Sequence, residues 1–209
     1  MYQRPDNDQN PFSPLPGTSP SRRALFIDRW GTLLELPPED PARTYDQLLF
    51  QEGAIDGLFR AVQAGWTIYL LGNEDRVARG AVDEARWKEF ESQLLLALGS
   101  AGVVVERNYA CVVHPEDGVG KLRTDSVFLL PNTGAMYHAR QHDGIDLGLS
   151  WVIGDSTLEL AAGWRAGCRT AGVRCGEGVT DGALEVDLDL YAPDLPSILD
   201  HLSQQLKAA

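Results

Sequence analysis

Two aspartates stand directly after apolar runs that have the length of buried strands. Asp28 follows Ala-Leu-Phe-Ile and precedes a Gly-Thr turn, and Asp155 follows Trp-Val-Ile-Gly. Because ligands of parallel α/β sheets bind beyond the carboxyl ends of the strands, we expect the two carboxylates to converge on one crevice. Paired carboxylates are typical ligands of a hard cation such as Mg²⁺. The alternative for Asp155 is to cap a helix that starts near Thr157.

The elements that position these aspartates alternate along the chain. From residue 24 onward, short apolar runs alternate with amphipathic stretches, which is typical of βα units around a mainly parallel sheet with helices on both faces. We expect strands over 24–27, 66–71, 109–113, 151–153, 168–173 and 186–190. We expect helices over 54–64, 81–98, from about 134, over 158–166 and over 195–206. The predicted fold class is therefore α/β.

Composition narrows the class of protein. The 30 acidic and 18 basic residues give a net charge of −12, which disfavours binding to nucleic acid or to an anionic membrane. No apolar run approaches the roughly 20 residues that span a bilayer. Three unpatterned cysteines fit a reducing compartment, so we expect a cytoplasmic protein. We also expect a monomer. Residues 1–22 carry five prolines among polar residues, which predicts a flexible tail before one domain over 23–209.

Five segments between residues 24 and 175 carry motifs in a characteristic order. The first reads Phe-Ile-Asp-Arg-Trp-Gly-Thr-Leu around Asp28, and residues 71–80 read Leu-Gly-Asn-Glu-Asp-Arg-Val-Ala-Arg-Gly. The others are 111–116, 145–147 and 150–168. Together they resemble the haloacid dehalogenase superfamily, most closely its D-glycero-D-manno-heptose-1,7-bisphosphate phosphatases and histidinol phosphatases, whose first motif is Asp-Arg-Asp-Gly-Thr. The resemblance implies a Rossmann-like fold without a large cap domain.

The resemblance assigns catalytic positions and shows two replacements. In that family the first aspartate attacks phosphorus, and Asp28 holds its position. The second aspartate acts as general acid and base, a role worth about 10²–10⁴-fold in rate. Trp30 stands there, and an indole has no transferable proton near neutral pH. The family's charge-neutralising lysine is replaced by Leu130, so the sequence predicts impaired turnover.

The resemblance also assigns ligand-binding positions. The hydroxyl residue that holds the phosphoryl group is replaced by Gly72, while Asn73 and Arg79 match the substrate-binding motif. Arg29, Arg79, Lys121 and Arg123 are the candidates to supply the missing positive charge. Trp30 either fills the pocket or forms an aromatic wall for a different ligand.

The resemblance implies a Mg²⁺ site but no zinc site. Mg²⁺ would be held by Asp28, the backbone carbonyl of Trp30 and Asp155, with Glu159 in support. The family's four zinc positions read Cys111, Val113, Ser126 and Phe128. Because one cysteine cannot hold zinc, no zinc is expected.

Three functions are compatible with these residues. The first, which we favour, is a catalytically impaired phosphatase relative whose scaffold binds a small phosphorylated metabolite or a protein partner. It is favoured because the acid/base, the lysine, the hydroxyl and the zinc ligands are missing together. The second is a divergent Mg²⁺-dependent phosphatase that forms an aspartyl-phosphate on Asp28. The third is a small-molecule sensor.

Overall fold

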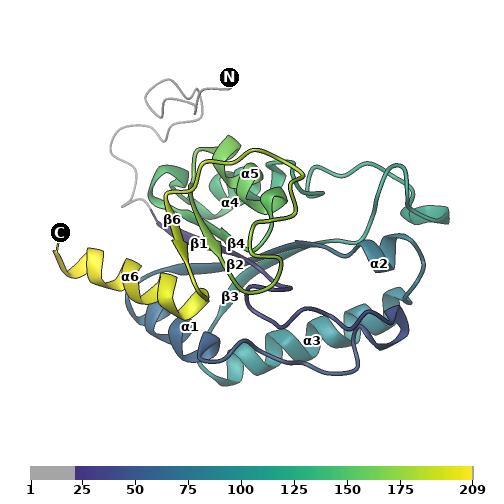
Figure 1. The fold of residues 1–209 in the computed structure, drawn as a ribbon, viewed down its shortest axis with the longest axis horizontal. Helices are drawn as coiled ribbons and strands as arrows, with labels where there is room; N and C mark the ends of the chain where they lie inside the picture. The colour runs from purple at the N-terminus through teal and green to yellow at the C-terminus, as the bar shows by residue number, and fades with distance from the viewer. Residues whose placement is uncertain (1–21, 209) are drawn as a thin grey trace.

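Six parallel strands form the central sheet of the computed structural model, which describes residues 22–208 (Figure 1). They are β1 (Ala24–Asp28), β2 (Thr67–Asn73), β3 (Val105–Cys111), β4 (Trp151–Gly154), β5 (Arg169–Val173) and β6 (Leu190–Ala192). Their order is β3-β2-β1-β4-β5-β6. The winding direction reverses between β1 and β4, and such a switch point opens a crevice at the carboxyl ends of the strands. The predicted α/β class is confirmed.

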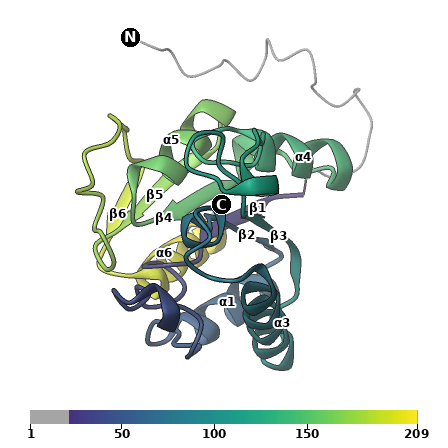
Figure 2. The ribbon, with the colours of Figure 1, turned by 90° about the vertical axis from the view of Figure 1, so that its right-hand side faces the viewer.

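Helices cover both faces of this sheet, as Figure 2 shows. One face carries α1 (Ala54–Gln63), α3 (Glu84–Ser100) and α6 (Leu195–Ala208), and the other carries α4 (Gly134–Asp143) and α5 (Thr157–Ala166). The short helix α2 (Asp75–Ala78) follows β2. Within residues 22–208, 3-10 helices lie at Pro41–Arg43, Gly120–Leu122 and Leu147–Leu149. In the described part of the chain, no helix has the length and apolar composition needed to cross a membrane.

The core explains why β1 is apolar throughout. Leu25 and Ile27 pack against the α1, α3 and α6 side, whereas Ala24 and Phe26 pack against the α4 and α5 side. All four side chains are completely buried. Because successive residues of a strand point to opposite faces, a parallel strand covered on both faces must be apolar at every position.

The expected last strand differs from the structure, and the expected N-terminal tail lies almost entirely outside the described residues. The strand expected over 186–190 was wrong in position, since regular pairing begins only at Leu190. Just before this strand, the Asp189 carboxylate accepts a hydrogen bond from the Thr170 backbone N–H at 2.9 Å. The tail expectation concerns residues outside the described range, except for Arg22, which forms a β-bridge with Ile145.

The N-terminus of α5 is capped by Ser156 and Glu159 and not by Asp155. Ser156 is the N-cap, and its hydroxyl accepts a hydrogen bond from the Leu158 N–H. The Glu159 carboxylate reaches back and accepts from the Ser156 N–H at 2.6 Å, which completes a capping box. The alternative in which Asp155 caps this helix is therefore wrong, and Asp155 is free for another role.

Replacing the cap tests this local arrangement. We expect Ser156→Ala to lower the free energy of unfolding by about 0.5–2 kcal/mol, because backbone N–H groups of the first turn lose their acceptor. The matched control is Ser92→Ala, since Ser92 is an exposed residue within α3 whose hydroxyl only donates to the Lys88 carbonyl. Urea unfolding of both variants measures the difference. An equal loss in both would contradict the capping role.

Candidate functional site

A cleft of about 470 Å³ lies at the carboxyl ends of the strands. Asp28 ends β1 and Asp155 directly follows β4, and Ile27 pairs with Ile153 in the register of these neighbouring strands. Asp28 and Asp155 both line the cleft, together with Glu159. The structure therefore brings the strand-end aspartates together, as the sequence predicts.

These three carboxylates are buried and interact with one another. Burial raises the pKa of Asp28 well above its usual value, and the charges of Glu159 and Asp155 raise it further. Burial also raises the pKa of Asp155 to about 6 and that of Glu159 to about 7. The cluster is therefore an electrostatic setting that favours either bound protons or a cation.

Asp155 is held in place by the turn that follows β1 and by a later loop. Its carboxylate accepts hydrogen bonds from the Glu177 N–H at 2.7 Å and from the Thr32 hydroxyl at 3.3 Å. A Cβ atom at Gly31, whose φ is +81°, would overlap this carboxylate. The glycine of the first motif is therefore required for the close approach of Asp155 to the residues after Asp28.

A buried ion pair lies beside Asp28. The Arg29 guanidinium is completely buried and bonds to the Glu74 carboxylate at 2.8 Å and to the Gly72 carbonyl at 2.9 Å. The Tyr45 hydroxyl donates to the other Glu74 oxygen at 2.7 Å. Burial raises the pKa of Glu74, while Arg29 lowers it. Arg29 thus places a positive charge near Asp28, but Glu74 balances that charge.

The backbone at Gly72 does not accommodate the hydroxyl side chain that the resemblance implies. Its φ is +143°, and a Cβ atom there would lie 2.9 Å from Arg29 Nη2 and 3.0 Å from Asp28 Oδ1. Both the backbone conformation and the position of the guanidinium favour glycine.

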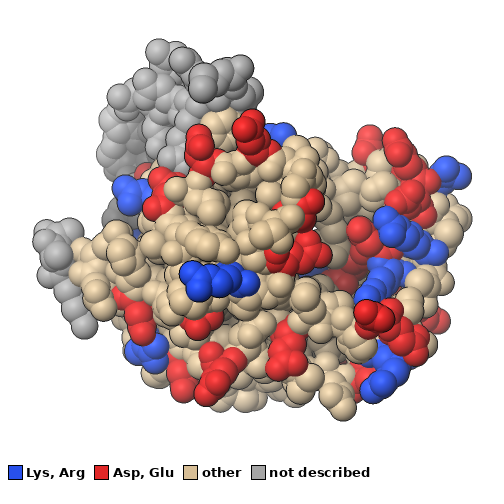
Figure 3. All heavy atoms as spheres, viewed as in Figure 1, with Lys and Arg blue, Asp and Glu red and all other residues tan. Residues whose placement is uncertain are grey.

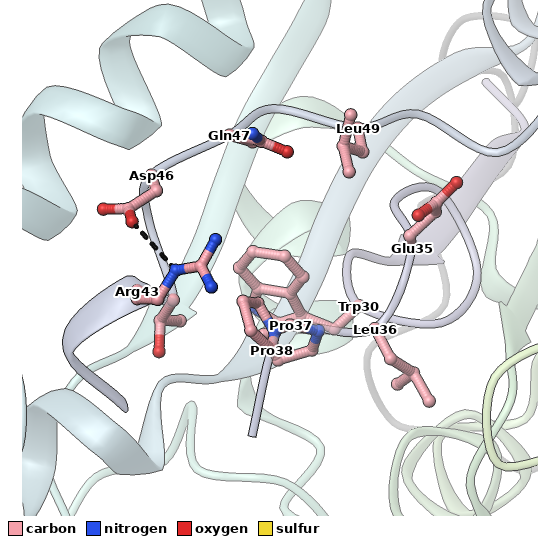
Figure 4. A pocket seen from close by; sticks show the side chains of 10 residues that line it. Trp30, Glu35, Leu36, Pro37, Pro38, Arg43, Asp46, Gln47 and Leu49 are labelled. Atoms are coloured by element: carbon pink, nitrogen blue, oxygen red, sulfur yellow. Dashed lines mark ion pairs between the residues drawn. The ribbon is translucent and has the colours of Figure 1, made fainter. Parts of the chain in front are cut away.

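Trp30 borders the cleft with its ring anchored in an aromatic cluster. The ring stacks on Phe90 with centroids 5.4 Å apart and lies 6.2 Å from the Tyr45 ring. Figure 4 shows it among Pro37 and Pro38 in a smaller pocket of about 40 Å³, where Arg43 pairs with Asp46 at 3.5 Å. The ring therefore packs against the core at the border of the cleft, and its role towards a ligand stays a prediction.

The structure brings Leu130 and Asn73 to the cleft without restoring a charge. Leu130 is 6% exposed and lines the cleft. The Asn73 side chain accepts from the Leu130 N–H at 2.9 Å and donates to the Leu130 carbonyl at 3.2 Å. Asn73 therefore positions the loop that carries Leu130, and both the oxygen and the nitrogen of its side-chain amide are hydrogen-bonded there.

The basic residues expected to compensate do not line the cleft. Arg79 pairs with Asp117 at 2.8 Å, and its side chain is 56% exposed. Lys121 pairs with Glu84 at 2.6 Å. On the face drawn in Figure 3, basic side chains gather mainly at the edge beside α2 and α3. Among the cleft-lining residues of the described chain, Arg76 is the only lysine or arginine.

The donor set fits the implied Mg²⁺. Asp28 and Asp155 supply carboxylate oxygens in a cluster that raises the pKa of Asp28, and the Trp30 carbonyl accepts none of the hydrogen bonds found within residues 22–208. Over the same range, no group of three or more His, Cys, Asp or Glu residues converges tightly enough to hold a metal. Mg²⁺ would therefore be held by two carboxylates, one carbonyl and water, which suits its preference for retained waters.

The strand order, the switch-point cleft and the aspartate that ends β1 define an α/β domain of the haloacid dehalogenase type. No model of a protein family matches the chain. The chain is 30% identical over 185 residues to D-glycero-beta-D-manno-heptose-1,7-bisphosphate 7-phosphatase from Pseudomonas aeruginosa, covering 88% of this chain and 99% of that protein. It is 30% identical over 156 residues to D-glycero-alpha-D-manno-heptose-1,7-bisphosphate 7-phosphatase from Burkholderia mallei, covering 73% of this chain and 80% of that protein.

A solved structure agrees with these relatives. D,D-heptose 1,7-bisphosphate phosphatase from B. bronchiseptica, complexed with magnesium and phosphate, superposes with a TM-score of 0.74 at 25% identity, covering 88% of this chain and 99% of that chain. The chain belongs to the heptose-bisphosphate phosphatase family of the haloacid dehalogenase superfamily.

Removing one partner of the buried ion pair tests its importance. We expect Arg29→Met to lower the free energy of unfolding by about 3–5 kcal/mol, because Glu74 is left buried without its cation. Arg79→Met is the control, because its exposed pair with Asp117 contributes about 0–1 kcal/mol. Urea unfolding compares the two. Similar small losses would show that Glu74 does not depend on Arg29.

The raised pKa values predict a pH dependence for the metal-free protein. Asp155 and Glu159 have ordinary pKa values of 3.8 and 4.5, so between about pH 4 and 7 the folded chain binds more protons than the unfolded chain. Their contribution to stability is present at the acidic end of this window and is lost as pH rises. We expect the fall to be shallower in Glu159→Gln, measured by urea unfolding in EDTA. Equal pH profiles for the two proteins would contradict the assignment.

Proposed function

We propose that the protein binds a small phosphorylated metabolite in the Asp28 cleft without measurable hydrolysis. The observation that carries this proposal is the pair of side chains found at two positions of the cleft lining, Trp30 and Leu130. Both residues line the cleft, and the family resemblance puts Trp30 at the position of the proton donor and Leu130 at that of the lysine. Loss of a general acid alone costs about 10²–10⁴-fold in rate.

The charges around the cleft support the same proposal. Seven acidic residues line it and one basic residue does; the acidic residues are Asp28, Glu74, Asp75, Asp155, Glu159, Glu177 and Asp181. Arg29 does not line the cleft; it is paired with Glu74, and its charge also lowers the pKa of Asp28. A phosphate group therefore needs Mg²⁺ to enter, and electrostatic stabilisation of transferred phosphoryl groups is weak here. The magnesium and phosphate in the B. bronchiseptica relative support this ligand class.

A second candidate is a divergent Mg²⁺-dependent phosphatase. It is favoured by the retention of Asp28 and Asp155 in one cleft and by relatives that are heptose-bisphosphate 7-phosphatases. In this case Asp28 would attack phosphorus, and a water or a ligand group would supply the proton that Trp30 cannot. For either candidate we expect a cytoplasmic protein that acts on a small metabolite.

Release of phosphate separates the two candidates. The unmodified chain is incubated with Mg²⁺ and D-glycero-D-manno-heptose 1,7-bisphosphate, beside a panel of sugar phosphates. We expect no release above that of Asp28→Asn, with binding of the bisphosphate detected by calorimetry. Release that disappears in Asp28→Asn would support the divergent phosphatase and overturn impaired turnover.

A further inference from the structure

Arg76 lies at the rim of the cleft, on α2 just beyond β2. Its Nη1 donates to the Pro38 carbonyl and to the Thr44 hydroxyl, each at 2.6 Å. These contacts fix the guanidinium against the loop that borders the Trp30 side of the cleft. A guanidinium carries five N–H donors. Within residues 22–208, the hydrogen bonds of the Arg76 guanidinium involve Nη1, so the donors on Nε and Nη2 stay available.

Arg76 differs from the other arginines near the cleft because it lines the cleft itself. Arg29 cannot reach a ligand, because it is completely buried and bonded to Glu74. Arg86 is directed away, since it holds the Ala42 carbonyl and the Asp46 carboxylate outside the cleft. Arg76 is therefore the one fixed positive charge of the described chain that a ligand in the cleft can contact.

Asp28 and Arg76 stand on different parts of the cleft wall. Asp28 ends β1 beside Asp155, whereas Arg76 follows β2 and faces the loop of Pro38 and Thr44. A phosphate at Asp28, held through Mg²⁺, therefore leaves the Arg76 side of the cleft for a second group of the ligand. Arginine binds phosphate through a planar fork of N–H donors, which is a strong and directional contact.

We propose that Arg76 binds the second phosphate of a bisphosphate ligand and makes the cleft prefer a bisphosphate to a monophosphate. This inference rests on the proposed function and names the specificity-determining residue of that site. It differs from the sequence expectation, which placed Arg79 in contact with the substrate.

Affinity for two ligands tests the proposal. Equilibrium dialysis with Mg²⁺ compares D-glycero-D-manno-heptose 1,7-bisphosphate with the 1-phosphate, and the recovered ligand is checked for released phosphate. We expect Arg76→Gln to weaken bisphosphate binding by about 10–100-fold, the range of a charge-assisted hydrogen bond. We expect its affinity for the monophosphate to change by less than about twofold on the same scale.

Two control variants separate ligand binding from support of the loop. Arg79→Gln removes a nearby arginine that pairs with Asp117 outside the cleft, and we expect it to change neither affinity. Thr44→Val removes one partner of Arg76 but keeps its charge, and we expect the preference for the bisphosphate to persist. Urea unfolding of each variant shows that the comparison is made between folded proteins.

The outcomes distinguish this inference from the proposed function. If Arg76→Gln weakens both ligands equally, or neither, Arg76 does not select the second phosphate and the inference is overturned. If the unmodified chain binds neither ligand, the proposed function fails as well. Released phosphate that depends on Asp28 would overturn impaired turnover but leave the role of Arg76 to be decided by the ratio of affinities.

Discussion

Burial of three carboxylates at one edge of the sheet is the constraint on which the site depends. Adjacent parallel strands bring Asp28 and Asp155 together, and the capping box of α5 brings Glu159 beside them. Burial raises the pKa of each of the three, the charge of Asp155 raises the pKa of Asp28 and of Glu159 further, and the charge of Glu177 raises that of Asp155. A group of this kind is stable when protons or a cation offset the negative charge, so protonation, metal binding and ligand binding are expected to be coupled.

The surrounding residues retain the scaffold of a phosphatase but change what it can do. Gly31 allows Asp155 to approach the first turn, and Arg29 supplies a buried cation close to Asp28. Glu74 neutralises that cation, and Trp30 packs its ring into the core where an acid is needed. Under the proposed function, this arrangement would hold a metal and a ligand but lack groups that transfer protons and stabilise charge.

The sequence predicted the features that follow from strand geometry and motif spacing. Asp28 and Asp155 converge because both end adjacent parallel strands, and Trp30 borders the cleft because it lies two residues beyond Asp28. The capping role of Glu159 was missed, although Ser156 followed three residues later by a glutamate is a recognisable signal.

Other features depend on contacts between distant segments, which no local pattern records. Tyr45 reaches Glu74 from an irregular loop, and Asn73 engages the backbone of Leu130. The two arginines of the second motif illustrate the same limit: Arg79 turns towards Asp117, while Arg76 lines the cleft. Both were visible in the sequence, but only the packing of the later loops decides which one a ligand meets.

Under the proposed function, Asp28 lies in a cleft that binds a phosphorylated ligand without completing phosphoryl transfer. Rapid acid quenching of the chain with Mg²⁺ and heptose bisphosphate, followed by mass spectrometry of the tryptic peptide of residues 24–29, tests this directly. The account predicts that this peptide stays unmodified at every reaction time. A phosphorylated peptide that is absent from the Asp28→Asn variant would contradict it, because it would show that Asp28 still acts as a nucleophile.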